Sequence, residues 1–246
     1  MTLEGRHVLV TGAARGLGAV LARTLADAGA RLILADIAEE EGRAVAADIN
    51  GHFLPVDLAD PAYIDALGQA VGAHTDGVLH GLVNNGAVAT NVGGKTFEQI
   101  DIETWDRVMG VNVRGTWLMV RAMAPLLRAS GSGRIVNVAS DTALWGAPKL
   151  LSYVASKGAV IAMTRSLARE LGPDGVGVTA IAPGILTTPS TDYVPEARHR
   201  HYADGRAAPG SHAPEEVAGT VTFLLGEDAL SLTGQVLPVN KGFVFG

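Results

Sequence analysis

The chain alternates short apolar runs with longer segments of helical period, and this alternation most restricts the folds open to it. Residues 6–11 (R-H-V-L-V-T), 31–36 (R-L-I-L-A-D) and 133–140 (G-R-I-V-N-V-A-S) are apolar over most of their length. Strands that are apolar on both faces are typical of parallel sheets covered by helices on both sides. Right-handed crossovers then give a doubly wound arrangement. We therefore predict an α/β fold of three layers, α/β/α, around a parallel sheet of about seven strands.

The pattern also predicts where the elements lie. Strands are expected at residues 6–11, 31–36, 51–56, 78–84, 133–140, 175–182 and 235–239, and helices at 17–28, 39–49, 61–71, 104–129, 152–171 and 214–225. Asp60, before Pro61, is the predicted N-cap of the third helix. No linker is long enough to divide the 246 residues, so one domain over residues 1–246 is expected. Residues 187–213 are too long for an ordinary connection, and we expect a mobile substrate flap there.

Composition excludes several classes of function. The chain has no cysteine, which removes disulfides, thiolate zinc sites and a cysteine nucleophile. A net charge of -6 gives no electrostatic reason to expect nucleic acid as a partner. No apolar run is long enough to cross a membrane, and the N-terminus has no signal-peptide core, so we expect a cytoplasmic protein. His199 and His201 do not share a helical face, and no metal site is predicted.

A glycine-rich turn (T-G-A-A-R-G-L-G, residues 11–18) joins the first strand to the first helix. Gly12 permits a tight turn, while Gly16 and Gly18 let the backbone approach a diphosphate and let the helix pack close to the strand. The positive N-terminal end of that helix would then face the phosphates. A strand before the turn and a helix after it are the context that this motif requires, so the turn predicts a Rossmann-type nucleotide site.

Asp36 makes a dinucleotide the expected ligand of this nucleotide site. It ends the second strand, 18 residues beyond Gly18, where a carboxylate can accept hydrogen bonds from the adenosine ribose. A carboxylate there repels the 2′-phosphate of NADP and favours NAD, which is the cofactor we predict. Arg15 argues for NADP if it pairs with that phosphate, and is otherwise a solvated turn residue. Asp57 either caps the adenine edge or is an ordinary acid at a strand end.

A second group of residues suggests proton transfer. Tyr153 and Lys157 lie four positions apart on a predicted helix, so their polar ends can address one point. A neighbouring cation favours the phenolate and brings the pKa of a phenol nearer to neutral, as an acid/base catalyst requires. Ser140 ends the fifth strand, 13 residues before Tyr153, and strand ends border the crevice of such a sheet. Asn112 is a poor helix former inside a helix, which indicates a buried polar role.

With these residues the chain resembles the short-chain dehydrogenase/reductase family, in its branch of single-domain subunits of about this length. The similarity runs from residue 5 to about residue 242. It includes the T-G-x-x-x-G-x-G fingerprint at 11–18, Asn112, Ser140, Tyr153 and Lys157 in the family's order and spacing, and a loop at 183–188 (P-G-I-L-T-T) that resembles one contacting nicotinamide. Two motifs depart from the family's usual pattern. Residues 84–87 read N-N-G-A instead of N-N-A-G, and residues 240–242 read N-K-G where D-G-G is common.

The resemblance implies a role for each matching residue. Tyr153 would exchange a proton with the substrate oxygen, Ser140 would donate a hydrogen bond to that oxygen, and Lys157 would hold the nicotinamide ribose and lower the pKa of Tyr153. Asn112 would organise a water that links Lys157 to solvent. The residues expected to contact NAD are Gly12, Arg15, Gly16, Leu17, Gly18, Asp36, Asp57, Leu58, Asn84, Asn85, Gly86, Tyr153, Lys157, Pro183, Gly184, Leu186 and Thr188.

The predicted function is NAD-dependent hydride transfer between nicotinamide and a secondary alcohol or ketone. Ser140, Tyr153 and Trp145 are expected to contact the substrate, although Trp145 could equally pack in the core. Apolar residues around Trp145 favour a hydrophobic or ring-bearing substrate, whereas Arg198, Arg200 and neighbouring histidines form either an anion-binding flap or a solvated helix face.

Two other functions stay open: an NADPH-dependent 3-oxoacyl-carrier-protein reductase, and a non-catalytic dinucleotide-binding scaffold or redox sensor. The resemblance also implies a homotetramer. The apolar tail at residues 242–246 either packs against a neighbouring subunit or folds onto its own core.

Overall fold

Seven parallel strands form one sheet at the centre of the computed structural model, which describes residues 2–188, 191 and 194–245. The strand order is β3-β2-β1-β4-β5-β6-β7. The chain starts in the middle of the sheet, builds outward to β3, and returns to build the other half from β4. The order therefore reverses between β1 and β4, and ligands of doubly wound sheets bind beside such a reversal, at the carboxyl ends of the strands. The predicted fold class is confirmed.

The elements follow the predicted order. The strands are β1 (His7–Thr11), β2 (Arg31–Asp36), β3 (His52–Pro55), β4 (Gly81–Asn84), β5 (Arg134–Val138), β6 (Gly177–Pro183) and β7 (Val236–Val239). The helices of eight or more residues are α1 (Gly16–Asp27), α2 (Glu39–Asp48), α3 (Pro61–His74), α4 (Ile102–Met109), α5 (Thr116–Ala129), α7 (Leu151–Leu171), α8 (Glu196–Gly205) and α9 (Glu215–Leu224). The predicted N-cap of α3 is confirmed, because the Asp60 carboxylate accepts a hydrogen bond from the amide of Ala62 at 2.8 Å.

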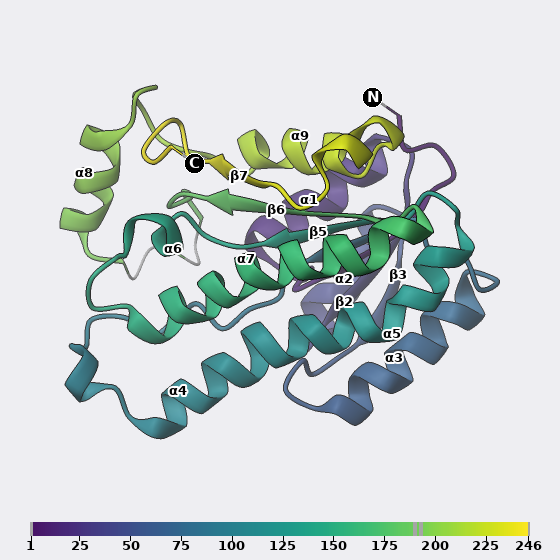
Figure 1. Cartoon of the computed structure of the whole chain (residues 1–246), viewed down its shortest axis with the longest axis horizontal. Coiled ribbons are helices and arrows are strands. Elements are labelled where there is room, and N and C mark those ends of the chain that lie inside the picture. The colour runs from purple at the N-terminus through teal and green to yellow at the C-terminus, as the bar shows by residue number, and fades with distance from the viewer. Residues whose placement is uncertain (1, 189–190, 192–193, 246) are drawn as a thin grey trace.

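Side chains that alternate along each strand build two large cores, and a smaller third cluster lies between β6 and α7. In β1, Val8 and Val10 face one core and Leu9 faces the other, as the two-residue period of a strand requires. The first core lies under α1, α2 and α9, and the second lies under α3, α5 and α7. Figure 1 shows these helices on the two faces of the sheet. Covering both faces explains why the strands read as continuous apolar runs.

The predicted helix at residues 104–129 is interrupted. It consists of α4 and α5 joined by a π-helical turn, Gly110–Gly115, which contains Asn112. Such a turn inserts an extra residue into the helix and is frequent at functional sites. An apolar period extends across the whole segment, so the pattern could not reveal the irregularity.

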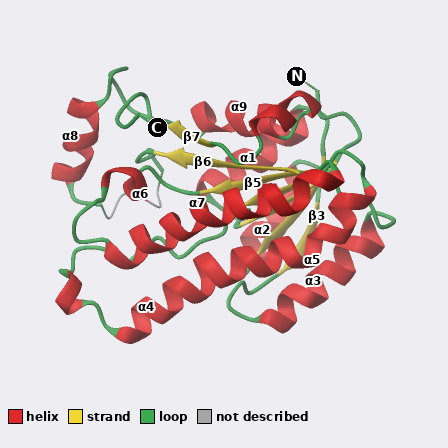
Figure 2. Cartoon of the chain, viewed as in Figure 1, coloured by secondary structure: helices red, strands yellow, loops and turns green. Residues whose placement is uncertain are grey.

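The segment at residues 187–213 contains a helix that no apolar period signalled. This helix, α8, has Tyr202 as its buried side chain, and its other described side chains are polar or only partly covered. In Figure 2, α8 lies at the end of the molecule toward which the arrowheads of β6 and β7 point, beside the short helix α6 (Thr142–Trp145). Residues 189–190 and 192–193 of the predicted flap lie outside the described residues. Along the described chain, no helix is both long and apolar enough to span a membrane.

Candidate active site

The glycine-rich turn adopts the geometry that its sequence predicts. Gly12 and Gly16 have φ angles of +63° and +54°, in the left-handed region that favours glycine. A Cβ atom on Gly12 would lie 2.6 Å from Gly86 Cα, and one on Gly18 would overlap the carbonyl oxygen of Gly12. The turn, the start of α1 and the segment after β4 are therefore packed backbone against backbone.

Thr11 and Asn85 hold this packing together. The Thr11 hydroxyl oxygen accepts hydrogen bonds from the amides of Asn85 and Gly86, each at 3.0 Å. In return, Asn85 Nδ2 donates to the carbonyl oxygens of Thr11 and Gly12, both at 3.0 Å. The order G-A at residues 86–87 thus puts a glycine against Gly12, where a side chain would not fit.

The start of α1 is suited to a diphosphate. The N-cap residue Arg15, which precedes the helix, is extended and exposed, and no side chain caps the helix. Uncapped amides at a helix N-terminus attract anionic oxygens. A cavity of about 580 Å³ opens over this end of α1 and is lined in part by Arg15, Gly16, Thr188 and Ser211. The uncapped amides, together with the glycines that leave no side chain over the turn, fit the diphosphate of a dinucleotide.

Asp36 lies where the sequence predicted an acid. Its carboxylate accepts hydrogen bonds from the amides of Ala14, at 2.9 Å, and Ala38, at 3.0 Å, one on each oxygen. The side chain is thereby fixed at the end of β2 beside the glycine-rich turn. Asp57 instead accepts from the amide of Ala59 at 2.8 Å, which is a local turn contact. Leu58 is half-buried, and its Cδ1 lies close to the position that a Cβ on Gly86 would take.

Lys157 and Tyr153 lie on one face of α7. The Lys157 ammonium lies 5.7 Å from the centre of the Tyr153 ring and donates a hydrogen bond to the carbonyl oxygen of Val138, at 2.7 Å, at the end of β5. Lys157 is 4% exposed, and this burial lowers the pKa of its ammonium to about 8. The cation is therefore anchored to the segment that carries Ser140, two residues after Val138.

Asn112 joins the π-helical turn to α7. Its Oδ1 accepts from the amide of Val88 at 2.7 Å, and its Nδ2 donates to the carbonyl oxygen of Val88 and to the hydroxyl of Ser156, both at 3.1 Å. The Ser156 hydroxyl in turn donates to the carbonyl oxygen of Tyr153 at 2.8 Å. Asn112 is buried, at 1% exposure, and its bond to Ser156 ties the π-helical turn to the turn of α7 that bears Tyr153 and Lys157.

Ser140 lies at the carboxyl edge of the sheet, just beyond β5. Its hydroxyl oxygen accepts hydrogen bonds from the amide of Thr142, at 3.3 Å, and from the Thr142 hydroxyl, at 2.9 Å. These bonds connect Ser140 to the first residue of α6, and they occupy its acceptor positions. The segments that carry Asn112, Ser140, Tyr153 and Lys157 are thus joined by the bond of Lys157 to Val138 and that of Asn112 to Ser156.

The segment after β6 closes the same edge. The Pro183 carbonyl accepts from the amide of Asp141 at 3.0 Å, and the amide of Gly184 donates to the carbonyl oxygen of Val239 at 3.3 Å. Leu186 and Thr188 are buried. Asn84 is also buried, and its Nδ2 donates to Asn137 Oδ1 at 2.9 Å, a contact between β4 and β5 within the sheet.

Trp145 packs against the segment that was predicted as a flap. Its Nε1 donates to the Tyr202 hydroxyl at 3.3 Å, and the Arg198 guanidinium lies 5.5 Å from the centre of its ring. Arg198 also donates to the carbonyl oxygen of Pro148 at 3.1 Å. Both side chains therefore attach α8 to the segment that follows Ser140.

Sequence reasoning missed three residues at this edge: Asp141, Tyr202 and Asn240, all buried and linked to one another. The signals available were an acid directly after Ser140 and an asparagine where the family pattern has aspartate. Across the described residues, no group of three or more histidine, aspartate and glutamate side chains could hold a metal ion.

The comparisons with known proteins each match nearly the whole chain. A family model described as enoyl-(acyl carrier protein) reductase matches residues 12–244. The chain is 38% identical to a 3-alpha-(or 20-beta)-hydroxysteroid dehydrogenase of Mycobacterium bovis, over 99% of this chain and 91% of that protein. It is 35% identical to a cyclopentanol dehydrogenase of a Comamonas species, over 98% of each. A crystal structure of 3-ketoacyl-(acyl-carrier-protein) reductase from Brucella melitensis, complexed with NADH, superposes with a TM-score of 0.92 at 31% identity, over 99% of this chain and 100% of that one.

Proposed function

Because the chain belongs to the short-chain dehydrogenase/reductase family of oxidoreductases, we propose that it interconverts a secondary alcohol and a ketone with NAD, and that Tyr153 is the general acid/base. The observation that carries this proposal is the buried Lys157 ammonium beside the Tyr153 ring, on a helix turn that Asn112 holds in place. A scaffold that only bound a dinucleotide would have no use for a cation buried beside a phenol.

The chain's own residues supply the proton chemistry. The bound dinucleotide would supply the two-electron donor or acceptor at its nicotinamide. In the oxidative direction, Tyr153 Oη takes the proton of the substrate hydroxyl, and in the reductive direction it returns a proton to the carbonyl oxygen. The Lys157 ammonium stabilises the phenolate through its charge. The Ser140 hydroxyl, whose acceptor positions Thr142 occupies, donates to the substrate oxygen.

A Tyr153→Phe variant tests this mechanism. It retains the ring beside Lys157 but removes the proton donor, so turnover should fall by about 10² to 10⁴, while NADH binding, measured by fluorescence titration, stays within about twofold of the wild type. Full turnover in this variant would exclude Tyr153 as the acid/base. The exposed Tyr63, changed to phenylalanine, is the matched control.

The preference for NAD rests on Asp36. Its carboxylate is held by two amides beside the turn, so it cannot easily move away from a 2′-phosphate. Titration of the wild type with NADH and NADPH tests the preference, and tighter binding of NADPH would overturn it.

The proposed substrate is a ring-bearing, largely apolar alcohol or ketone. Trp145, at the end of the short helix α6 that follows Ser140 in the chain, supplies an aromatic ring. Relatives of this chain are a hydroxysteroid dehydrogenase and a cyclopentanol dehydrogenase. A panel of hydroxysteroids, cyclopentanol and linear alcohols, assayed with NAD, tests this class. Equal kcat/KM for linear and cyclic alcohols would contradict it.

The second candidate is a 3-oxoacyl-carrier-protein reductase. Arg15 lies exposed at the start of α1, where it could pair with a 2′-phosphate, and the structural neighbour from Brucella melitensis is a reductase of this kind. Reduction of an acetoacetyl thioester by NADPH at a higher kcat/KM than that of any alcohol or ketone in the panel would favour this function.

We also propose a homotetramer, in which the C-terminal tail takes part. Phe243 packs against Tyr202 of its own chain, whereas Phe245 is 81% exposed. Phe245 is thus the tail side chain free to enter a neighbouring subunit. A Phe245→Ser variant should sediment as a smaller species than the wild type. Unchanged sedimentation would remove the tail from the interface.

A further inference from the structure

A carboxylate is buried directly beside the catalytic strand end. Asp141 follows Ser140 and is 0% exposed. Its Oδ1 accepts a hydrogen bond from the Tyr202 hydroxyl of α8 at 2.7 Å, and its Oδ2 accepts from Asn240 Nδ2, at the end of β7, at 3.4 Å. Its amide donates to the Pro183 carbonyl oxygen at 3.0 Å. One residue therefore touches three segments that are more than 40 positions away from it in the sequence.

A relay of two hydrogen bonds runs from Trp145 of α6 through Tyr202 of α8 to the Asp141 carboxylate, and each donor in it faces the carboxylate. Trp145 Nε1 donates to the Tyr202 hydroxyl, and the Tyr202 hydroxyl donates to Asp141. The indole nitrogen can only donate, so the Tyr202 hydroxyl accepts from it and gives its own proton to the Asp141 carboxylate. The Trp145 ring is held at the same time by edge contacts with Tyr202 and Phe243.

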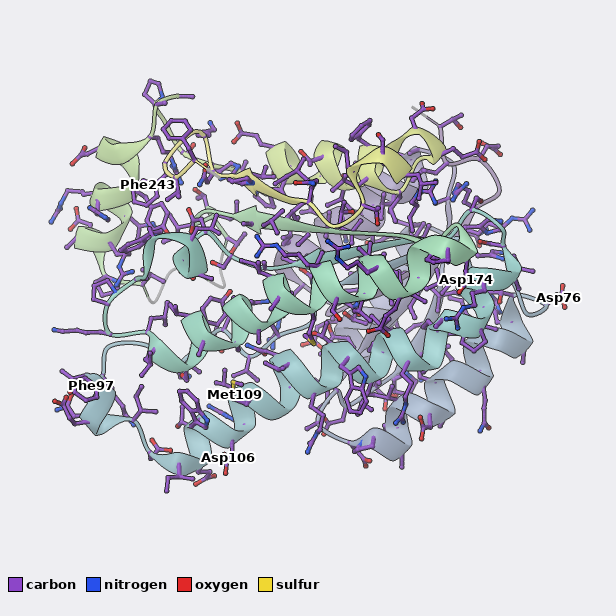
Figure 3. All side chains as sticks on the ribbon, viewed as in Figure 1. Asp76, Phe97, Asp106, Met109, Asp174 and Phe243 are labelled. Carbon is purple, nitrogen blue, oxygen red and sulfur yellow. The ribbon has the colours of Figure 1, made fainter. Side chains whose placement is uncertain are left out.

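The C-terminal tail completes the same cluster. The Tyr202 and Phe243 rings stack with their centres 4.2 Å apart, and Figure 3 shows Phe243 beside α8. Asn240 Oδ1 accepts from the amides of Gly242 and Phe243, so Asn240 cannot rotate its amide group without losing both bonds. Its Nδ2 is therefore fixed toward Asp141.

Asn240 and Asp141 are chemically matched. An aspartate at position 240, as in the common family pattern, would place a second carboxylate against Asp141 in a buried site, and two such carboxylates cannot both be ionised cheaply. Gly184 is matched as well, because a Cβ there would lie 3.0 Å from Asp141 Oδ2. Arg206, which follows α8, is a charged group that acts on Asp141, whereas the Tyr202 hydroxyl is a neutral hydrogen-bond donor.

We propose that Asp141 is a positioning residue for the reaction: it fastens α8 and the C-terminal tail to the segment bearing Ser140. Through the buried Tyr202 it also fixes Trp145, whose ring is the proposed aromatic contact for the substrate. This role rests on the proposed function, since it is through Trp145 that Asp141 affects catalysis. Its carboxylate oxygens are bonded to Tyr202 and Asn240, so in this proposal it acts through other residues. Its loss should raise the KM for the alcohol and leave the binding of NADH unchanged.

Hydrogen exchange of the backbone amides in α8 tests the fastening without any turnover. In Tyr202→Phe the ring remains stacked on Phe243, but the bond to the carboxylate is lost. A hydrogen bond to a charged group is worth enough to speed local opening about tenfold to about a hundredfold when it is removed, so exchange at residues 196–205 should rise by that factor. Tyr63→Phe, at an exposed tyrosine of α3, should leave exchange in α8 unchanged.

A swap of the matched pair separates this role from a general loss of packing. Asp141→Asn retains an acceptor for Tyr202 but turns a donor toward Asn240 Nδ2, so exchange in α8 and the tail should rise and the KM should increase about tenfold or more. The double variant Asp141→Asn with Asn240→Asp restores one donor facing one acceptor. It should return the KM to within about threefold of the wild type while kcat changes little in either variant.

Three results would overturn the proposal. These are unchanged exchange in α8 for both Tyr202→Phe and Asp141→Asn, a KM that does not change although exchange rises, and a swap that does not rescue the single variant. If the wild type binds NADH but oxidises no alcohol and reduces no ketone, the proposed function fails, and the exchange measurements alone still decide whether Asp141 fastens α8.

Discussion

The Thr11 hydroxyl joins the end of β1 to the segment after β4, beside the proposed dinucleotide site. It is 1% exposed and accepts hydrogen bonds from two consecutive amides after β4, those of Asn85 and Gly86. It also donates to the carbonyl oxygen of Val83 at 3.3 Å. Replacing it with valine preserves the shape of the side chain and removes all three bonds, so Thr11→Val isolates the hydroxyl.

The loss in the free energy of unfolding can be worked out from the hydrogen bonds that remain in the variant. The amide of Asn85 keeps a second acceptor, the Val83 carbonyl at 3.1 Å, whereas no second acceptor within the described residues is seen for the amide of Gly86. An amide left without a partner costs about 1–3 kcal/mol, and each ordinary hydrogen bond lost costs about 1 kcal/mol. We expect the free energy of unfolding to fall by about 3–5 kcal/mol in total, which for a chain of this size lowers Tm by about 6–20 °C.

Thr75→Val is the matched control. Thr75 is as deeply buried, at 2% exposure, but its hydroxyl only donates to the Val71 carbonyl, which the Thr75 amide also reaches. No group is left without a partner, so the cost should stay within about 1 kcal/mol. Urea denaturation and calorimetry at one fixed protein concentration measure both variants. NADH titration should show weaker binding for Thr11→Val alone. Equal losses of stability in the two variants would refute the view that the Thr11 hydroxyl holds the turn.

Three further predictions concern the same edge of the sheet. Asp36→Ala removes the fixed carboxylate and should shift the ratio of NADH to NADPH affinity toward NADPH by about tenfold to about a hundredfold, measured by fluorescence titration; an unchanged ratio would show that Asp36 does not select the cofactor. Gly18→Ala, whose Cβ would overlap Gly12 O, should abolish NADH binding and lower Tm, whereas Gly219→Ala in α9, with open space around it, should raise stability by about 0.5–1 kcal/mol. Burial lowers the folded-state pKa of Lys157 to about 8, so the unfolded chain binds the extra proton between pH 8 and about 10.4 and stability due to this group rises through that window. The difference in unfolding free energy between the wild type and Lys157→Met should therefore grow by about 3 kcal/mol across it, and a constant difference in urea melts would contradict the lowered pKa.

Most of the fold could be predicted because its determinants are local. A strand buried on both faces must be apolar throughout, and each crossover helix has one apolar stripe, so the alternation along the chain marks the elements. Element ends were less predictable: β4 begins at Gly81 instead of residue 78, because Val78 and His80 form irregular contacts before the ladder starts. No break in the apolar period marked the π-helical turn around Asn112, and no apolar period marked the helix α8.

In the candidate site, too, local features were predictable and long-range contacts were not. Gly12, Gly18 and Asp36 could be read from the sequence because a strand, a turn and a helix place them relative to one another over a short stretch of chain. Tyr153 and Lys157 were predictable from one helical turn. The contact between Lys157 and Val138, and that between Asn112 and Ser156, depend on how α7 packs against β5 and the π-helical turn, and spacing alone does not contain that information.

The departure from the family pattern at residues 240–242 is explained by Asp141, a residue far away in the sequence. Taken alone, Asn240 in place of the usual aspartate has no evident reason. Its Nδ2 lies 3.4 Å from Asp141 Oδ2, and burial raises the pKa of the Asp141 carboxyl to about 6, so a hydrogen-bond donor at position 240 suits this carboxyl. Above that pH the carboxylate is ionised, and with a second carboxylate as neighbour it would be forced to keep a proton. The bond from Tyr202 would then lose the charge that strengthens it. The choice of asparagine at the end of β7 and of aspartate after Ser140 is therefore a single feature, shared between two positions 99 residues apart.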